Sequence, residues 1–388
     1  MKYSRNQINK AGEILLTSSD KEKVNQVIDR INDWRMLHLP VLEELYYNIV
    51  ITFKKENVHI HSVSHRLKRF SSIRNKIALN PNMGLGGLQD IGGLRIVVST
   101  MKVLDKAFFI LRNNIPDHFE LTKDPVNYVA DPKKESGYRS IHFIYKYKSR
   151  NHDLDGLKIE LQLRTKLQHS WAMAVETAEL ITKSPLKSGK GEEEWIVFFK
   201  IISSLFAFKE KTPILREHFN KGYGTITDII SQLYKLNRDN NFIDKLKALN
   251  ISNKYSKEEN HKNGYYILNM NFVDKSVSIK PFPKDKEKEA LDEYSLEEKN
   301  VEDKKNAVVL VSVPKFQALQ EAYPSYFLDT NKFINNIEIE IGKRFGFIDG
   351  KKFRSIFAKI YPDSDEQYVK DEKEFSELVE KYKKTGEK

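Results

Sequence analysis

Residues 138–165 read YRSIHFIYKYKSRNHDLDGLKIELQLRT, a stretch that predicts two β-strands joined by a polar loop. Successive side chains of a strand point to opposite faces of a sheet, and both halves of this stretch alternate between polar and apolar residues. One face of the pair collects Tyr138, Ser140, His142, Glu160, Gln162 and Arg164. The other face collects Ile141, Phe143, Tyr145, Ile159, Leu161 and Leu163. The alternation predicts an antiparallel hairpin that buries its apolar face and leaves its polar face open to water or to a ligand.

The whole chain has 388 residues, a length that favours two or three domains over a single core. It contains no cysteine, which excludes disulfides and cysteine metal sites. His59, His61 and His65 have no fixed partner carboxylate, so we interpret them as ordinary surface or hydrogen-bonded residues rather than metal ligands. Residues 1–20 contain no continuous apolar run, so we expect neither a signal peptide nor a membrane anchor, and a cytoplasmic location. The formal net charge of +11 favours polyanionic partners, although a basic pocket in an enzyme explains it equally well.

A cluster of cations without any acid lies between residues 66 and 76. Its members are Arg66, Lys68, Arg69, Arg74 and Lys76. On a helix, Arg69 and Lys76 would lie near one face, with Ser72 close by. Such a run usually marks a solvated helix face. The same side chains suit a triphosphate site, because arginine offers a planar fork of donors and lysine a point charge.

A glycine-rich loop, NPNMGLGGLQD at residues 80–90, precedes a strand that we expect at residues 94–99. The loop lacks the lysine and the spacing of a Walker loop or a dinucleotide fingerprint, so its glycines indicate backbone freedom. Asp90 lies at the mouth of the strand. It is either a turn or cap residue, or a metal carboxylate that pairs in space with Glu160.

Four motifs follow one another along this part of the chain. They are R-x-K-x-x-x-S-I-x-x-K at 66–76, D-I-x-G-x-R-I at 90–96, G-Y-x-S-x-H at 137–142 and E-x-Q-x-R-T at 160–165. In this order and at these separations they resemble the synthetase domain of the RelA/SpoT family of alarmone synthetases. The resemblance covers residues 55–185 and includes a closing helix at 165–183. We expect that helix to pack on the sheet through the apolar stripe of Leu167, Trp171, Ala174, Val175 and Ala178.

The resemblance implies an α+β fold with a nucleotidyltransferase-like mixed sheet flanked by helices. It also implies a pyrophosphokinase of the stringent response that moves the β,γ-pyrophosphoryl group of ATP to the 3′-hydroxyl of GDP or GTP. Asp90 and Glu160 would hold Mg²⁺, and Glu160 would help to deprotonate the attacking hydroxyl. The ATP-binding residues would be Arg66, Lys68, Ser72, Lys76 and Arg95. The acceptor would meet Lys133, Tyr138, His142, Gln162 and Arg164, with its base stacked on Tyr138.

Two features depart from the pattern of that family. Full-length members carry a hydrolase domain with histidine and aspartate metal ligands ahead of the synthetase domain, whereas here we expect only helices. Many small members have W-A-x-x-E-H after the E-x-Q-x-R-T motif. In this chain Trp171 and Ala172 are followed by Glu176 one position late, with Thr177 in the histidine position. This second difference bears on the helix register or on the acceptor contacts and leaves the carboxylate pair intact.

The chain divides into five expected segments. They are a helical flank (1–54), the synthetase-like domain (55–185), a helical extension (186–260), a small C-terminal α+β domain (261–345) and a charged tail (346–388). In the α+β domain, GYYILNMNF and KSVSIKPF predict a hairpin, followed by a charged helix, a buried strand NAVVLVSV and a helix begun by Pro314. The charges of the tail nearly cancel, so we expect helical pieces or partial disorder there.

Three functions stay open. The favoured one is synthesis of (p)ppGpp from ATP and a guanosine nucleotide. The second resembles the toxic branch of the family, which uses the 3′ end of tRNA as acceptor and is restrained by a fused C-terminal region until a phage protein is sensed. The third is a non-catalytic nucleotide- or RNA-binding module, against which the pair of Asp90 and Glu160 argues. We further expect that removal of the chain beyond residue 255 raises activity, because an attached segment acts at high effective concentration. The sequence predicts no oligomeric state.

Overall fold

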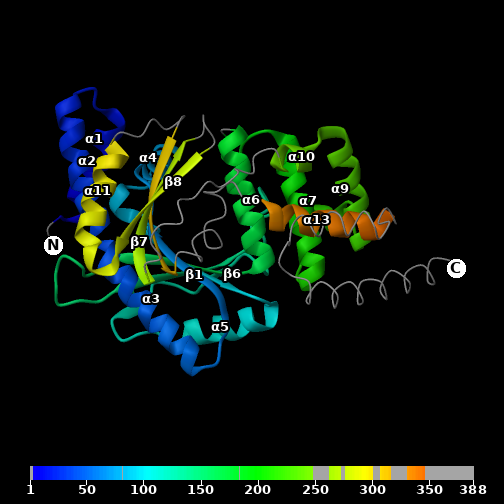
Figure 1. Cartoon of the computed structure of the whole chain (residues 1–388), viewed down its shortest axis with the longest axis horizontal. Helices are drawn as coiled ribbons and strands as arrows, with labels where there is room; N and C mark the ends of the chain where they lie inside the picture. The colour runs from blue at the N-terminus through cyan, green and yellow to red at the C-terminus, as the bar shows by residue number, and fades with distance from the viewer. Residues whose placement is uncertain are drawn as a thin grey trace.

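The computed structural model describes residues 3–80, 82–182, 184–247, 262–271, 276–299, 306–315 and 330–345. Its architecture is α+β, with one mixed sheet flanked by helices (Figure 1), as the sequence predicted. None of the helices within these residues is long and apolar enough to cross a membrane.

The elements follow one another along the chain with these bounds. The strands are β1 (Ile60–Leu67), β2 (Gly92–Val98), β3 (Phe119–Leu121), β4 (Val126–Asn127), β5 (Ile141–Tyr147), β6 (Lys158–Thr165), β7 (Lys262–Asn271), β8 (Ser276–Pro283) and β9 (Asn306–Lys315). The helices before β7 are α1 (Arg5–Thr17), α2 (Lys21–Met36), α3 (His38–Lys55), α4 (Phe70–Leu79), α5 (Met101–Asn113), α6 (Lys166–Thr182), α7 (Glu193–Glu210), α8 (Arg216–Asn220), α9 (Ile226–Asn240) and α10 (Phe242–Lys247). Those after it are α11 (Glu287–Lys299) and α13 (Asn331–Phe345), and short 3₁₀ turns occur at η1 (Leu85–Gly87), η2 (Leu186–Ser188) and η3 (Lys284–Lys286).

The predicted central hairpin is present as β5 and β6. The two strands pair antiparallel, with His142 opposite Gln162 and Ile144 opposite Glu160. The apolar face of the hairpin packs on α3 and α5 in one core. That core includes Val41, Leu42, Leu45, Leu104, Ala107, Phe143 and Leu161. The alternation in the sequence therefore gave the buried face correctly, and it leaves the Glu160 face for the site.

The sequence suggested that the cations at residues 66–76 lie on one helix, but the structure distributes them over a strand, the two residues after it and a helix. Arg66 belongs to strand β1, and α4 begins only at Phe70. β1 pairs antiparallel with β2, which in turn pairs parallel with β6. Pairing with β1 satisfies the backbone groups along this side of β2, and such tertiary pairing overrides the local charge pattern.

The apolar stripe of α6 packs mainly against other helices rather than on the sheet. It shares a core with residues of α7, α9, α10 and α13, including Phe198, Ile202, Leu233, Leu246 and Phe333. The indole N–H of Trp171 donates to the backbone oxygen of Phe199 at 2.9 Å. The helical extension and α13 therefore cover the apolar stripe of α6 on this side.

The strands after residue 261 continue the central sheet instead of forming a sheet of their own. The strand order is β3-β5-β6-β2-β1-β9-β7-β8, with β4 paired to β5. β9 joins β1 through His65 opposite Ser312 and Arg66 opposite Val311. The hairpin β7–β8, the charged helix α11 and the strand β9 confirm the predicted elements. The sheet continues from the strands before residue 261 to those after it, so it does not mark the predicted domain boundary there. That boundary stays a prediction.

One expectation about the C-terminal part is wrong, and two others cannot be compared with the described residues. Pro314 lies inside β9, so it does not begin a helix. The helix expected after it and the charged tail at 346–388 lie outside the described residues.

His38, in the first turn of α3, makes the stability of this region sensitive to acid. It is 1% exposed, and its Nδ1–H donates to Trp34 O at 3.0 Å. Burial lowers the pKa of His38 from 6.5 to about 4. Between these two values the unfolded chain binds a proton that the folded chain does not bind, so stability falls as the pH drops through this window.

We therefore expect the stability advantage of the wild type over His38→Gln to shrink by roughly 2 kcal/mol between about pH 7 and about pH 5. Urea unfolding of both proteins at the two pH values measures this difference. A difference that stays constant with pH would show that His38 does not titrate in this way.

Candidate active site

The polar face of the sheet lines a cavity of about 730 Å³. Its walls come from β1, β2, β5 and β6 and the residues next to these strands, from α4, from Glu179 of α6, and from the loops at residues 128–138 and 185–188. The predicted site residues that line it are Arg66, Lys68, Ser72, Lys76, Asp90, Arg95, Lys133, Tyr138, His142, Glu160 and Gln162. The remaining one, Arg164, is fully buried behind the lining. The four sequence motifs therefore meet in one place.

Strand register explains why residues so far apart in sequence meet. Arg66 lies opposite Gly93, and Gly93 lies opposite Glu160. Paired residues on neighbouring strands point to the same face, so Arg66 and Glu160 face the cavity from strands roughly 10 Å apart. A Cβ at Gly93 would meet no heavy atom closer than Arg66 O at 3.8 Å, so this glycine leaves the floor between them open. Arg95 and Gln162 form a second row one step along the strands.

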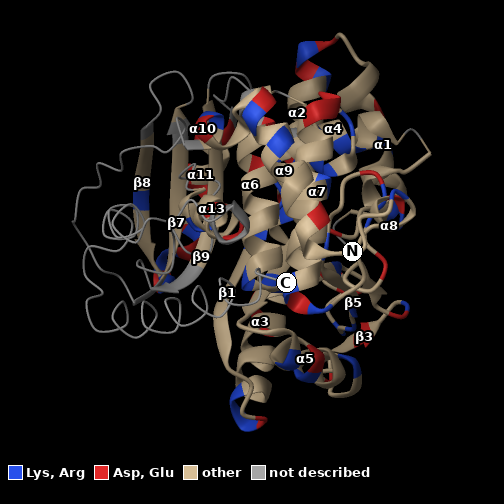
Figure 2. Cartoon of the chain, turned by 90° about the vertical axis from the view of Figure 1, so that its right-hand side faces the viewer, with Lys and Arg blue, Asp and Glu red and all other residues tan. Residues whose placement is uncertain are grey.

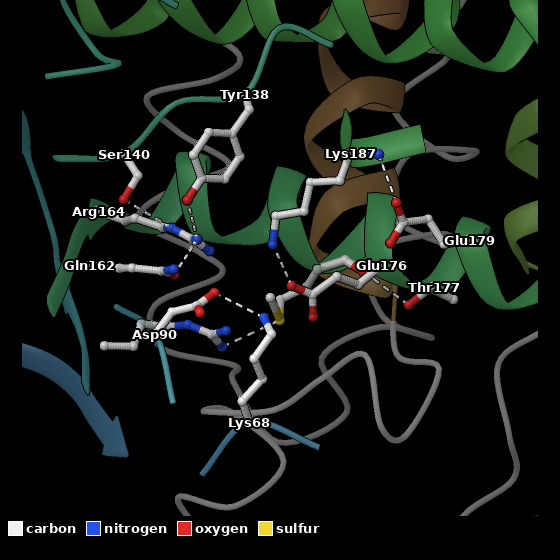
Figure 3. A network of polar contacts seen from close by, with 12 residues as sticks. Lys68, Asp90, Tyr138, Ser140, Gln162, Arg164, Glu176, Thr177, Glu179 and Lys187 are labelled. Carbon is white, nitrogen blue, oxygen red and sulfur yellow. Dashed lines mark hydrogen bonds and ion pairs between the residues drawn. The ribbon is translucent and has the colours of Figure 1, made fainter. Parts of the chain in front are cut away.

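Asp90 enters the cavity just before β2 and is held by two lysines. Its Oδ2 accepts from Lys68 Nζ at 2.9 Å and from Lys76 Nζ at 2.7 Å. Figure 3 shows Lys68, at the bottom of the view, reaching toward Asp90. Burial alone would raise the pKa of Asp90, but the charges of Lys68 and Lys76 outweigh it and hold the pKa below its ordinary value. Asp90 is therefore a carboxylate at neutral pH.

Glu160 is held by neighbours on its own sheet. Its carboxylate lies 3.0 Å from His142 Nδ1 and accepts from Gln162 Nε2 at 2.6 Å. Burial would raise the pKa of Glu160, but the hydrogen bonds and charge of His142, together with Gln162, keep it well below its ordinary value. Burial would lower the pKa of His142, but Tyr138 and Glu160 outweigh it and raise this pKa.

The two carboxylates fit a magnesium site. Asp90 Oδ1 is buried and has no hydrogen-bond partner among the described residues. Glu160 is close enough for its charge to act on the pKa of Asp90. The described residues contain no cluster of three or more His, Cys, Asp or Glu that could hold a metal. Mg²⁺ commonly binds through one or two carboxylates and completes its shell with substrate phosphates and water, so two carboxylates suffice.

Tyr138 is more enclosed than a stacking platform on an open strand would be. It is 2% exposed, and its hydroxyl accepts from Arg164 Nη2 at 2.7 Å and lies 2.7 Å from His142 Nε2. Arg164 also donates to Gln162 Oε1 at 2.6 Å. Burial would raise the pKa of Tyr138, but Arg164, His142 and Lys187 outweigh it and lower the pKa to about 7. Arg164 therefore holds Tyr138 and Gln162 in place from behind the cavity wall and does not line the cavity itself.

The structure adds a residue group that sequence reasoning missed. Lys187 Nζ donates to Glu176 Oε1 at 2.6 Å, and the backbone N–H of Lys187 donates to Glu179 Oε1 at 2.7 Å (Figure 3). The ammonium group of Lys187 also lies 5.4 Å from the centroid of the Tyr138 ring. Glu176 is the acid that stands one position late relative to the family motif, and here it fixes a lysine from the loop after α6. The sequence of that loop, SPLKSGKG, resembles an ordinary linker and gave no signal of a cavity residue.

Removal of the Tyr138 hydroxyl tests this network. We expect Tyr138→Phe to lower the free energy of unfolding by about 1–3 kcal/mol, because buried Arg164 loses an acceptor and His142 loses a partner. Chemical denaturation measures the loss. Tyr128→Phe is the matched control, since the described residues provide no hydrogen bond to the Tyr128 hydroxyl and its ring lines the same cavity. Equal stability of both variants would contradict the network.

Residues 65–184 match the family model described as a region found in RelA / SpoT proteins. No curated protein matches the chain. Among solved structures, the chain is similar to small alarmone synthetase 1 from Bacillus subtilis, with 21% identity over 47% of this chain and 93% of that chain and a TM-score of 0.40. It is similar to a GTP pyrophosphokinase family protein from Streptococcus pneumoniae, with 22% identity, coverage of 47% and 89% and a TM-score of 0.38. A third match is the Bacillus subtilis small alarmone synthetase 1 bound to its product pppGpp, with 23% identity, coverage of 47% and 92% and a TM-score of 0.38.

These TM-scores are low, so the assignment rests on the matched region and on the motifs within it. Asp90 and Glu160 fall inside the match. Of the residues that line the cavity, Ser64, Pro185, Lys187 and Ser188 lie just outside it. The chain therefore carries a RelA/SpoT region at residues 65–184, which confirms the resemblance of its four motifs.

Proposed function

We propose that this chain is an ATP-dependent pyrophosphokinase that transfers the β,γ-pyrophosphoryl group of ATP to the 3′-hydroxyl of GDP or GTP. The observation that carries the proposal is the convergence of Asp90 and Glu160 with several cations in one cavity of the RelA/SpoT region. Transfer at phosphorus depends mainly on positioning and charge neutralisation, and this cavity supplies both.

The donor side of the cavity is its cationic wall. Arg66 on β1, Lys68 after it and Lys76 on α4 present three positive charges to the same space. Burial lowers the pKa of Lys68, but the charge of Asp90 opposes this shift. We assign these residues, with Ser72 and Arg95, to the triphosphate of ATP. Mg²⁺ bound at Asp90 and Glu160 would neutralise the phosphate charge.

The reaction needs little proton abstraction by the protein. The 3′-oxygen of the acceptor forms a bond to the β-phosphorus of ATP, the bond from that phosphorus to the oxygen bridging the α-phosphate breaks, and AMP leaves. A carboxylate with a pKa as low as that of Glu160 is a weak base. In a loose transition state the attacking hydroxyl loses its proton late, so a weak base that also orients the hydroxyl is sufficient.

The acceptor side combines lysines with aromatic rings. Lys133 Nζ lies 4.8 Å from the Tyr128 centroid and 5.4 Å from the Tyr138 centroid, and Lys187 Nζ also lies over Tyr138. These two ammonium groups suit the phosphates of a nucleotide, and His142 and Gln162 lie beside them. Stacking of the acceptor base on Tyr138 would require the lysines to move off the ring and onto the phosphates.

The acceptor is identified by a transfer assay with γ-labelled ATP. The full chain is incubated with GDP, GTP or bulk tRNA, and we expect the label to appear in the guanosine nucleotides. Label in tRNA alone would show that the acceptor is the 3′ end of tRNA and not GDP or GTP. The absence of label from every acceptor would refute the proposed pyrophosphokinase activity. On the helices drawn in Figure 2, Lys and Arg are interspersed with Asp and Glu. This distribution differs from the continuous basic surface that is typical of proteins that bind nucleic acid.

A further inference from the structure

Helix α4 carries Ser72 and Lys76 into the cavity, yet its own sequence does not cap it. The N-cap residue is Arg69, and its side chain makes no capping hydrogen bond. Helix N-termini leave backbone N–H groups without partners, and an uncapped start frays. Because Lys68 lies just before the helix, the order of this start decides where three of the proposed ATP-binding side chains lie.

The missing cap comes from the C-terminal part of the chain. Glu298, at the end of α11, accepts from the backbone N–H of Phe70 at 2.9 Å through Oε1. The same oxygen accepts from the hydroxyl of Tyr294 at 2.7 Å. Glu298 is separated from Phe70 by 228 residues. A carboxylate at a helix N-terminus satisfies the free N–H and interacts favourably with the helix dipole.

A buried arginine links this cap to the other side of the turn. Arg35 of α2 is fully buried, and its Nη1 donates to Glu298 Oε2 at 2.7 Å. Its Nη2 donates to the backbone oxygen of Lys68 at 2.8 Å and to Tyr294 at 3.0 Å. Arg35 and Glu298 thus hold the backbone on both sides of Arg69, at Lys68 O and at Phe70 N.

The position of Glu298 is fixed by packing of the C-terminal segment. Tyr294 and Ala290 of α11 share a core with Leu39 of α3 and with residues of β7 and β9. Figure 1 shows α11 lying beside the N-terminal helices. The cap on α4 therefore depends on the strands and the helix that follow residue 261.

We infer that Glu298 is a positioning residue that orders the start of α4 and thereby places Lys68, Ser72 and Lys76 for the phosphates of the donor nucleotide. The inference rests on the proposed function, because it assigns the ordered segment to ATP. In this role the C-terminal segment is a working part of the donor site, although none of its described residues after 261 is among those that line the cavity.

The test measures binding of each nucleotide separately on the full-length chain with Mg²⁺. The probes are a non-hydrolysable ATP analogue for the donor site and GDP for the acceptor site, both by titration calorimetry. We expect Glu298→Ala to raise the Kd of the ATP analogue about ten-fold, on the scale of a lost helix cap, and to leave the Kd of GDP within about two-fold. Glu298→Gln, which keeps an oxygen for Phe70 N–H but loses the charge that pairs with Arg35, should recover part of the affinity.

The matched control is Glu293→Gln on the same helix. Glu293 pairs with Lys280 on the outer face of α11. Its substitution therefore removes one acid from α11 without changing a contact of residues 68–76. Loss of Glu298 alone leaves buried Arg35 without its anion, which can prevent folding. If Glu298→Ala does not fold, the double variant Arg35→Met/Glu298→Met replaces it, because this variant removes both charges. We expect the same loss of affinity for the ATP analogue.

Unchanged affinity for the ATP analogue in a folded variant overturns the inference alone. Equal weakening of the analogue and GDP also overturns it, because that result indicates general damage. A wild-type chain that binds no ATP analogue overturns the proposed function, and the inference with it.

Discussion

Glu160→Gln is expected to lower the rate of pyrophosphoryl transfer by about three orders of magnitude or more, since it removes the carboxylate that we propose holds Mg²⁺ and orients the attacking hydroxyl. The fold should survive, because glutamine has the same shape and keeps an oxygen for Gln162. Turnover is measured with labelled ATP at saturating acceptor, and folding by the thermal midpoint.

Glu120→Gln provides the control. Glu120 lies on β3 of the same sheet, outside the cavity lining, and pairs with Lys146 and Lys148 at the surface. Its loss should leave turnover unchanged. Asp90→Asn should abolish turnover as well, with a larger loss of stability, because Lys68 and Lys76 would face each other without their shared anion. Turnover near the wild-type rate in Glu160→Gln would remove Glu160 from the mechanism.

Local pattern was sufficient for the centre of this fold. The alternation of residues 138–165 fixes which face of β5 and β6 is buried, because a shift by one residue would turn every apolar side chain outward. The same alternation places His142, Glu160 and Gln162 on one face. These are properties of short stretches, so a single sequence carries them. That Asp90 and the cations join them was predicted by the resemblance of the four motifs to the RelA/SpoT family and results from the pairing of β1, β2 and β6.

Long-range pairing set the parts that the sequence did not show. Residues 60–67 form a strand because β2 lies beside them, and their charged end gave no strand signal. Lys187 belongs to the site only because Glu176 and Glu179, one helical turn apart on α6, hold it there. Glu298 caps α4 across 228 residues. Each of these depends on a partner that sequence spacing does not reveal.

The C-terminal segment is attached to the rest of the molecule at two places. At one, β9 pairs with β1, and α11 packs on α3. At the other, α13 inserts Phe333, Ile334 and Ile337 into the core formed by α6, α7, α9 and α10. An inhibitory domain that only rests on the active site would need neither attachment.

We therefore expect a chain that ends at residue 255 to be strongly destabilised, rather than more active as the sequence alone suggested. Each buried apolar side chain it loses contributes about 1.5–3 kcal/mol, and β1 would expose an unpaired edge that favours aggregation. Arg35 would also lose Glu298, so the start of α4 would fray and the proposed ATP site with it.

The measurement compares the thermal midpoint, solubility and ATP-analogue affinity of this truncation with those of a chain that ends at residue 345. The longer chain keeps every contact described for β7, β8, β9, α11 and α13, so we expect it to stay folded and to bind the analogue. A soluble, folded chain ending at 255 that transfers pyrophosphate faster than the full-length protein would restore the inhibitory role. Loss of folding in the shorter chain alone would establish the C-terminal strands and helices as part of the core of the whole chain, since the described elements by which the two truncations differ are those that pack on β1, α3 and α7.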